Sequence, residues 1–282
     1  MTTSSPSPSP SPEASPGALP GVPTGAPSHA DTRTSLFVVV PFHNEAAGMQ
    51  ATLDALSAQQ DTDFTLVLVD NASTDASRTI AERYADARGR ARTMVIGEAE
   101  KGTGAASDTG FRTAIANGAT IIARTDADCL PHPAWTARIR AAMVQDGLEF
   151  LGGRIAPRTD DGRVSLLQRF ILFAMITLAE NYGRLQRRGP QFKYPYFMAA
   201  GNNLAITASL YLRCGGFPRS AIEHTHEDRE LSEAVRTLTT RAARRPEILV
   251  YNSVRRVRAY GYLNTLRWYR NHGYRPQIVD IR

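Results

Sequence analysis

Residues 36–45 read Leu-Phe-Val-Val-Val-Pro-Phe-His-Asn-Glu, and this stretch decides the fold. A short, continuous apolar run that ends at a proline and polar residues is typical of a strand buried on both faces. The residues from Glu45 to about Gln59 that follow are predicted to form a helix. The strand pattern then returns at 64–70, Phe-Thr-Leu-Val-Leu-Val-Asp, so the sequence begins as strand, helix, strand.

Regular alternation continues to about residue 123. Strand candidates at 93–96 and 120–123 flank a predicted helix over about 106–116. Alternation of this kind predicts right-handed βαβ units and a mainly parallel sheet flanked by helices, the α/β class. The second half of the chain is less regular, and there we expect a strand at 247–251 and helices over about 164–187, 227–238 and 263–272.

The composition is that of a globular protein with a distinct amino-terminal tail. Of the 282 residues, 42% are hydrophobic and 21% are charged. Eight of the 17 prolines lie between Pro6 and Pro27, among Ser, Gly and Ala. We therefore expect residues 1–32 to be a disordered Ser/Pro-rich tail and residues 33–282 to form one domain, which is long enough for ordinary core burial.

Cysteine content and hydropathy indicate the compartment in which the protein is expected. Cys129 and Cys214 are too few for a disulfide framework or a structural zinc site, and they fit a reducing compartment. The sequence has no secretory signal pattern and no run of about 18 apolar residues. We expect a cytoplasmic protein without a membrane-spanning helix.

Positive charge gathers near the end of the sequence. Residues 241–282 hold ten arginines against Glu247 and Asp280, in a chain whose net charge is +6. Such a segment attracts anions, so nucleic acid, an anionic membrane surface and a diphosphate-bearing substrate all fit by charge, as does a solvated face without a partner.

Polar side chains follow three predicted strands, at 43–45, 70–75 and 125–128. Open parallel sheets bind ligands at the carboxyl ends of their strands, so this edge is the expected site. Asp126 and Asp128 can both direct carboxylate oxygens at Mg²⁺ or Mn²⁺. The alternative for this pair is a turn in which the aspartates accept backbone N–H bonds.

Three other motifs each allow two interpretations. Glu227 and Asp228 stand where a helix is predicted to begin, which itself favours negative charge, but a carboxylate there could also act as a general base. Lys101-Gly102, before a predicted helix, resembles a phosphate-binding loop but lacks the ending of a P-loop, and a flexible entry to the helix is the alternative. Gly201-Asn202-Asn203 offers amides suited to sugar hydroxyls or phosphates, and it is equally typical of a turn.

Taken in order, these motifs resemble those of family 2 glycosyltransferases. The match covers about residues 36–238, and the ordered set is far more specific than any one motif. It consists of Pro41-x-x-Asn44-Glu45, Asp70-Asn-Ala-Ser73-Thr-Asp75, Lys101-Gly102, Asp126-Ala-Asp128, Gly201-Asn202-Asn203, Gly215-Gly216-Phe217 and Glu227-Asp228. The resemblance implies the GT-A fold, a Rossmann-like mainly parallel sheet, with a nucleotide-sugar-binding half at 33–130 and an acceptor-binding half at 131–282.

The resemblance also implies a reaction. It is the inverting transfer of a sugar from a nucleotide-diphosphate sugar to a hydroxyl of a carbohydrate or lipid-linked acceptor, in cell-surface polysaccharide or glycolipid synthesis. Asp228 would be the catalytic base, and Glu227 would contact the acceptor or position the loop. Mn²⁺ or Mg²⁺ would stabilise the departing diphosphate. A lipid-linked acceptor would be reached by peripheral membrane association, through residues 166–178 or the basic carboxyl end.

Individual donor-side roles follow from the same resemblance. Asp128 and Asp126 would hold the metal ion, with His272 as a further ligand. The remaining donor contacts would come from Pro41, Glu45, Asp70, Lys101 and Asn202. One departure leaves donor preference open, because Ser107 and Asp108 occupy positions where relatives often carry Arg and Asn.

The same residues give weaker support to other functions. A nucleotidyl transferase usually places a glycine-rich basic signature after its first strand, and residues 41–45 contain no glycine, lysine or arginine. A nucleic-acid-binding protein would use the arginine-rich end, but no recognised binding motif accompanies that charge, so we expect no nucleic-acid partner. A catalytically silent scaffold is disfavoured because Asp128 and Asp228 are both present.

The tail interpretation predicts that a variant lacking residues 1–31 keeps its fold and its activity, because this segment lacks the apolar residues needed to join a core. Circular dichroism, thermal unfolding and an activity assay of the shortened and full chains check this. Loss of activity on deletion would contradict it.

Overall fold

The computed structural model describes Met1 and residues 34–158, 160, 174, 189–219, 227–255 and 261. The chain divides into two compact units, Met1–Arg33 and Thr34–Arg282, and the fold described below is that of the second. The tail predicted over 1–32, apart from Met1, and the helices predicted over 164–187 and 263–272, apart from Ala174, lie outside the described residues.

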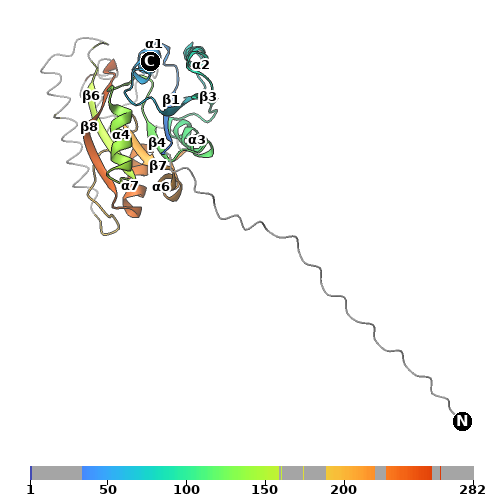
Figure 1. Ribbon diagram of the computed structural model, residues 1–282, viewed down its shortest axis with the longest axis vertical. Helices are drawn as coiled ribbons and strands as arrows, with labels where there is room; N and C mark the ends of the chain where they lie inside the picture. The colour runs from blue at the N-terminus through green and yellow to red at the C-terminus, as the bar shows by residue number, and fades with distance from the viewer. Residues whose placement is uncertain are drawn as a thin grey trace. The chain divides into compact units, whose positions relative to one another are not determined.

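One sheet organises the second unit (Figure 1), and its strand order is β3-β2-β1-β4-β7-β6-β8-β5. Its strands are β1 (Leu36–Phe42), β2 (Phe64–Asp70), β3 (Thr93–Gly97), β4 (Ile121–Arg124), β5 (Leu130–Pro131), β6 (Phe150–Pro157), β7 (Leu204–Thr207) and β8 (Ala242–Asn252). β1 pairs in parallel with β2 and β4, β2 with β3, and β6 with β8, whereas β7 is antiparallel to β4 and β6, and β5 to β8. All described strands except β5 and β7 therefore point the same way, which confirms the mainly parallel α/β sheet.

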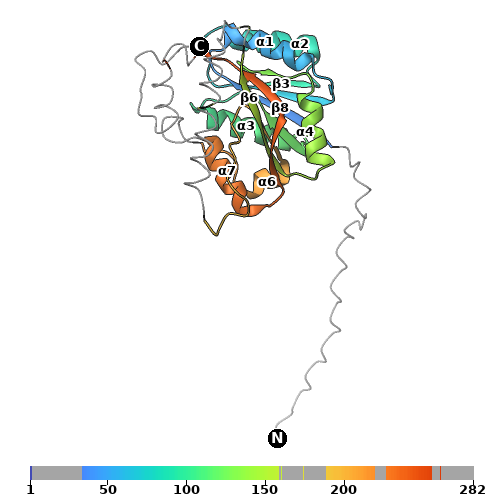
Figure 2. The same cartoon turned by 90° about the vertical axis from the view of Figure 1, so that its left-hand side faces the viewer.

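Helices cover both faces of this sheet (Figure 2). They are α1 (Ala46–Ser57), α2 (Ser77–Arg88), α3 (Thr103–Ala116), α4 (Trp135–Val144), α6 (Ala208–Arg213) and α7 (Glu227–Leu238). Side chains alternate along a strand, so Val38 and Val40 of β1 share one core cluster with α1, α2 and α4, while Val39 packs among α3, α6 and α7. Throughout the described residues, no helix combines the length and apolarity that crossing a membrane requires.

Several elements differ from the sequence prediction. β8 was predicted at 247–251 but begins at Ala242, because its first residues pair with β6 from Phe150 onward, before a register shift at Gly153/Arg154. α3 begins at Thr103 rather than near Ala106, directly after Gly102, whose φ of 138° only glycine adopts readily. β6, β7 and α4 were not predicted.

Gly110 sets how closely α3 approaches the sheet. A Cβ at this position would lie 2.4 Å from Val39 Cγ1 and 2.8 Å from Val69 Cγ2, closer than atoms in a packed core come. The missing side chain therefore lets α3 rest directly on β1 and β2, next to the strand ends that carry the expected site.

We predict that Gly110→Ala destabilises the protein by about 1–2 kcal/mol, because overpacking of about 1–3 kcal/mol outweighs the alanine helix preference of up to about 1 kcal/mol. Denaturant unfolding measures the change. Gly97→Ala is the matched control, since its Cβ would meet only Arg78 Nη1 at 3.5 Å. Equal stability of the two variants would show that α3 has room to move.

Candidate active site

The parallel strands β1, β2 and β4 end at one edge of the sheet, and polar loops follow each of them there. Asn44 has a φ of 52°, a left-handed conformation that asparagine tolerates, and its Oδ1 accepts a hydrogen bond from the Thr74 N–H at 2.8 Å. Its own N–H donates to Ser73 Oγ at 3.1 Å. The loop after β1 is thus tied to the loop after β2, as the sheet-edge argument predicts.

Glu45 and Asp128 meet through an arginine. Arg255 Nη2 lies 2.7 Å from Glu45 Oε2 and 3.6 Å from Asp128 Oδ2. Gly48 keeps this space open, since a Cβ there would lie 3.3 Å from Arg255 Nη2. Burial lowers the pKa of Arg255, but hydrogen bonding and charge from Glu45 outweigh it, so the pKa is raised and the group stays cationic.

Three other predicted donor residues lie on or near the same edge. Pro41 is buried within β1, opposite Val69. Asp70 Oδ1 accepts the Ser73 N–H at 2.9 Å, and its Oδ2 lies 3.3 Å from Arg78 Nη1. Lys101 is exposed, in the loop ahead of α3. His272 lies outside the described residues.

A buried guanidinium joins the end of β4 to the start of α7. The Arg124 side chain is 2% exposed, and its Nη2 lies 3.2 Å from Asp126 Oδ1 and 3.4 Å from Glu227 Oε1. Gly201 packs against it, since a Cβ there would lie 2.9 Å from the guanidinium carbon. Burial lowers the pKa of Arg124, but the neighbouring carboxylates raise it further, so the side chain stays charged.

Asp228, the expected base, lies beside this ion pair. Its Oδ2 accepts the Gly201 N–H at 3.1 Å. Burial raises the pKa of Asp228 above its ordinary value, against the opposing effects of that hydrogen bond and of Arg124. Burial likewise raises the pKa of Glu227, against Arg124 and with a further contribution from Asp228. A carboxylate with a raised pKa is a stronger base than a solvated one.

Asn202 and Asn203 have different roles although they are adjacent. Asn203 is wholly buried: Trp135 Nε1–H donates to its Oδ1 at 2.9 Å, and its Nδ2 donates to Arg154 O and Ile248 O. Asn202 donates only weakly to Cys129 Sγ at 3.6 Å, and its buried Oδ1 has no hydrogen-bond partner among the described residues. Asn203 therefore holds the loop, whereas the side-chain oxygen of Asn202 is left without a partner among the described residues.

The side chains of Asp126 and Asp128 suit a divalent cation whose coordination shell is completed by a substrate. Asp126 and Asp128 present hard carboxylate oxygens on side chains that are 35% and 25% exposed. No group of three or more His, Cys, Asp or Glu side chains that could hold a metal occurs within the described part of the chain. Mg²⁺ and Mn²⁺ are commonly held by one or two carboxylates, with phosphate and water oxygens completing the shell.

Sequence reasoning missed two arginines, one within this site and one beside it. Arg124 ends the apolar run Ile-Ile-Ala-Arg of β4, and a charged residue inside a buried strand was the available signal. Arg219, beyond the Gly215-Gly216-Phe217 motif, contacts Glu98, Glu100 and Asp108, and nothing in its sequence context indicated these partners.

The profile of the glycosyl transferase family 2 matches residues 37–211, which include β1 to β4 and the acidic groups that follow them, while Glu227, Asp228 and Arg255 lie beyond the matched range. The chain belongs to this family. AglE of Haloferax volcanii, named as a glycosyltransferase, is 26% identical over 212 residues, which make up 72% of this chain and 62% of that protein. EpsJ of Bacillus subtilis, named as an uncharacterized glycosyltransferase, is 29% identical over 126 residues, 45% and 35% of the two lengths. The chain thus spans less than two thirds of each of these relatives.

Solved structures of glycosyltransferases share the fold. S. aureus TarS (residues 1–349), in complex with UDP-GlcNAc, aligns with a TM-score of 0.57 at 16% identity, over 78% of this chain and 58% of that one. The mannosyltransferase PcManGT of Pyrobaculum calidifontis, in complex with GDP-Man and Mn²⁺, aligns with a TM-score of 0.57 at 21% identity, over 82% and 62%. At these identities the likeness concerns the fold, and it confirms the GT-A architecture expected from the motifs.

Proposed function

We propose that this chain is an inverting glycosyltransferase that moves a sugar from a nucleotide-diphosphate sugar to an acceptor hydroxyl. The observation that carries the proposal is the pair of Arg124 contacts, at 3.2 Å to Asp126 and 3.4 Å to Glu227. They bring the acidic motif after β4 together with the acidic pair that begins α7. In the proposed reaction, a donor diphosphate bound at the first motif would therefore lie next to a general base at the second, as a displacement reaction requires.

In the proposed reaction, Asp228 is the general base. Its carboxylate takes the proton of the acceptor hydroxyl while that oxygen bonds to the anomeric carbon. The bond from that carbon to the diphosphate oxygen breaks on the opposite face, and the nucleoside diphosphate leaves with the electron pair. Asp228 then returns its proton to solvent. Glu227 contributes negative charge beside the base, and Arg124 holds that charge in place.

A divalent cation belongs to the proposal as a cofactor. Asp128 and Asp126 would hold Mn²⁺ or Mg²⁺, with His272 as a further ligand. When bound, the ion neutralises charge on the diphosphate and makes it a better leaving group. Arg255, which already contacts Glu45 and Asp128, offers a second positive charge at the same edge.

The substrates are proposed only by class. Uridine and guanosine diphosphate sugars are the donor candidates, because TarS and PcManGT were solved with UDP-GlcNAc and GDP-Man. Pro41, Glu45, Asp70, Lys101 and Asn202 are the proposed donor contacts, and the side-chain oxygen of Asn202 has no hydrogen-bond partner among the described residues. We propose a carbohydrate or lipid-linked acceptor, a role in cell-surface polysaccharide or glycolipid synthesis, and a cytoplasmic location with peripheral membrane association.

Calorimetric binding of UDP and GDP, with and without Mn²⁺, tests the donor half of this proposal. We expect metal-dependent binding of one nucleotide, and loss of the metal-dependent part in Asp128→Asn. Asp228→Asn should still bind, because an amide oxygen can accept the Gly201 N–H, while sugar transfer falls by about 10²–10⁴-fold. Absence of nucleotide binding to the intact chain under every condition would refute the proposal.

The pH profile tests the base. Because burial raises the pKa of Asp228, we expect the acidic limb of kcat/KM at a higher pH than for an ordinary aspartate, with activity lost as pH falls through that limb. Arg124 opposes this rise, so Arg124→Gln should move the limb to still higher pH, whereas Arg124→Lys should move it less. A limb that does not respond to the charge at position 124 would argue against Asp228 as the base.

A further inference from the structure

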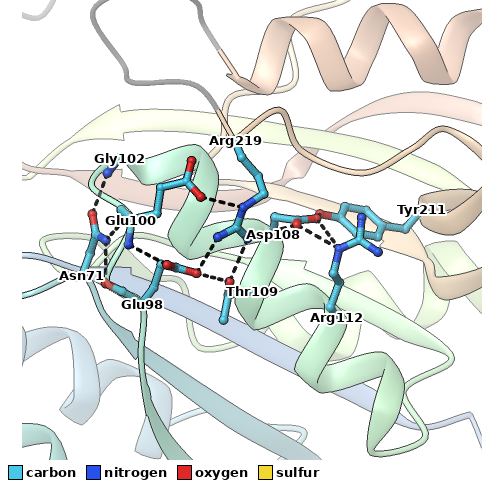
Figure 3. Close-up of polar contacts among 9 residues, drawn as sticks. All are labelled: Asn71, Glu98, Glu100, Gly102, Asp108, Thr109, Arg112, Tyr211 and Arg219. Atoms are coloured by element: carbon cyan, nitrogen blue, oxygen red, sulfur yellow. Dashed lines mark hydrogen bonds and ion pairs between the residues drawn. The ribbon is translucent and has the colours of Figure 1, made fainter.

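Arg219 joins three parts of the molecule outside the site described above (Figure 3). Its guanidinium lies 2.8 Å from Glu98 Oε2, 2.9 Å from Glu100 Oε2 and 3.3 Å from Asp108 Oδ2. It also donates to Thr109 Oγ1 at 3.0 Å. Glu98 and Glu100 belong to the loop after β3, and Asp108 and Thr109 to α3, so one side chain ties the segment after Phe217 to both elements.

The partners of Arg219 are held firmly themselves. Asp108 is almost wholly buried, and its Oδ1 accepts the hydroxyl hydrogen of Tyr211 at 2.9 Å. The Tyr211 hydroxyl oxygen in turn accepts the Phe217 N–H at 2.9 Å. Glu98 is 11% exposed and accepts a short hydrogen bond from Thr109. Two of the three carboxylates are thus shielded from water, where ion pairs are screened less than at an open surface.

The loop after β3 has a second anchor that does not involve Arg219. Asn71, directly after β2, donates from Nδ2 to Glu98 O at 3.0 Å and to Glu100 O at 2.7 Å. Its Oδ1 accepts the Gly102 N–H at 2.9 Å. Asn71 alone can therefore keep this loop against the donor edge. The contacts of Arg219 thus serve mainly to hold the Phe217–Arg219 segment in place.

That segment shares a support with the amino end of α7. A Cβ at Gly104, in the first turn of α3, would lie 2.3 Å from Pro218 O and 3.3 Å from Glu227 Cβ. Pro218 and Glu227 thus rest side by side on the same turn of α3. Any shift of Pro218 against α3 would disturb the packing of Glu227, and Asp228 is the next residue.

We propose that Arg219 is a positioning residue for the transfer reaction: it fastens the Phe217–Arg219 segment to α3 and thereby holds the start of α7, with Asp228, against the donor edge. This inference rests on the proposed function, since it concerns the same reaction. Among the described residues, the partners of Arg219 are Glu98, Glu100, Asp108 and Thr109 and do not include Asp228, so we infer that it acts through Pro218, Gly104 and Glu227.

Arg219 helps to keep the Glu98 carboxylate ionised. Burial raises the pKa of Glu98, but the hydrogen bonds from Thr109 and Arg219 outweigh it and lower the pKa to about 2. The other groups that face Arg219 are the carboxylates of Glu100 and Asp108 and the guanidinium of Arg112. Arg219 is not among the main groups that shift the pKa of Asp228, whereas Arg124 is. Loss of Arg219 should therefore reduce the rate without moving the acidic limb of the pH profile, which distinguishes it from loss of Arg124.

The test compares Arg219→Gln with Arg112→Gln in the full chain. Arg112 also pairs with Asp108, at 2.9 Å, but both residues lie on α3. Loss of the Arg112 side chain therefore removes no contact between different segments through this pair. Nucleoside diphosphate release from a UDP or GDP sugar gives kcat and KM, calorimetry gives nucleoside diphosphate affinity, and thermal unfolding gives stability. We expect a fall in kcat of about tenfold or more for Arg219→Gln, with affinity and the acidic limb unchanged. Arg112→Gln should match the wild type, and Arg219→Lys should recover part of kcat.

Other outcomes overturn the inference. Equal kcat in Arg219→Gln and Arg112→Gln would show that the tie to α3 does not affect the reaction. A parallel loss of kcat, affinity and thermal midpoint, in both the Gln and Lys variants of Arg219, would show a purely structural role. If the wild-type chain neither binds nucleotide nor releases it, the proposed function is refuted as well. If the wild type is active but the variants do not behave as expected, only the inference about Arg219 fails.

Discussion

The rest of the site depends on one buried cation, the guanidinium of Arg124. It lies at the end of a central strand, almost without access to water, and it is stabilised there by carboxylates from both halves of the chain. Removing one partner of a buried ion pair typically costs about 3–5 kcal/mol, against a total stability of about 5–15 kcal/mol for a folded domain. The contact that assembles the site is therefore also one of the contacts on which the fold depends.

The first half of the fold was predictable because its strands are short, apolar and locally bounded. All seven residues of β1 are buried, and such a run has few alternatives in a globular chain. β6 and β7 gave no comparable signal. β6 contains Gly152, Gly153 and Arg154, and β7 has only four residues, so both owe their structure to partners that are distant in sequence. Pairing of that kind is set by tertiary contacts, which a local pattern does not report.

Some residues of the site could likewise be predicted from the sequence, and others could not. Glu45, Asp70, Asp126 and Asp128 could be identified because they follow predicted strands, and parallel strands bring their carboxyl ends to one edge. The long-range contacts of the arginines could not be predicted. Arg124 reaches Glu227 and Arg219 reaches Asp108, each across more than 100 positions of sequence. Arginine is abundant in this chain, so no single one stands out before its partners are known.

The connection between β6 and β7 has a further consequence. The two strands are antiparallel neighbours with Gly152 opposite Leu204, and Asn203 bonds across to Arg154 and Ile248, so both ends of the connection are fastened at the edge that bears the acidic groups. Doubling the length of a loop costs in general only about 0.6 kcal/mol in closure entropy. The register between β6 and β7 is therefore set by pairing within the sheet, so a change in the number of residues between Asp160 and Gly189 leaves it unaltered.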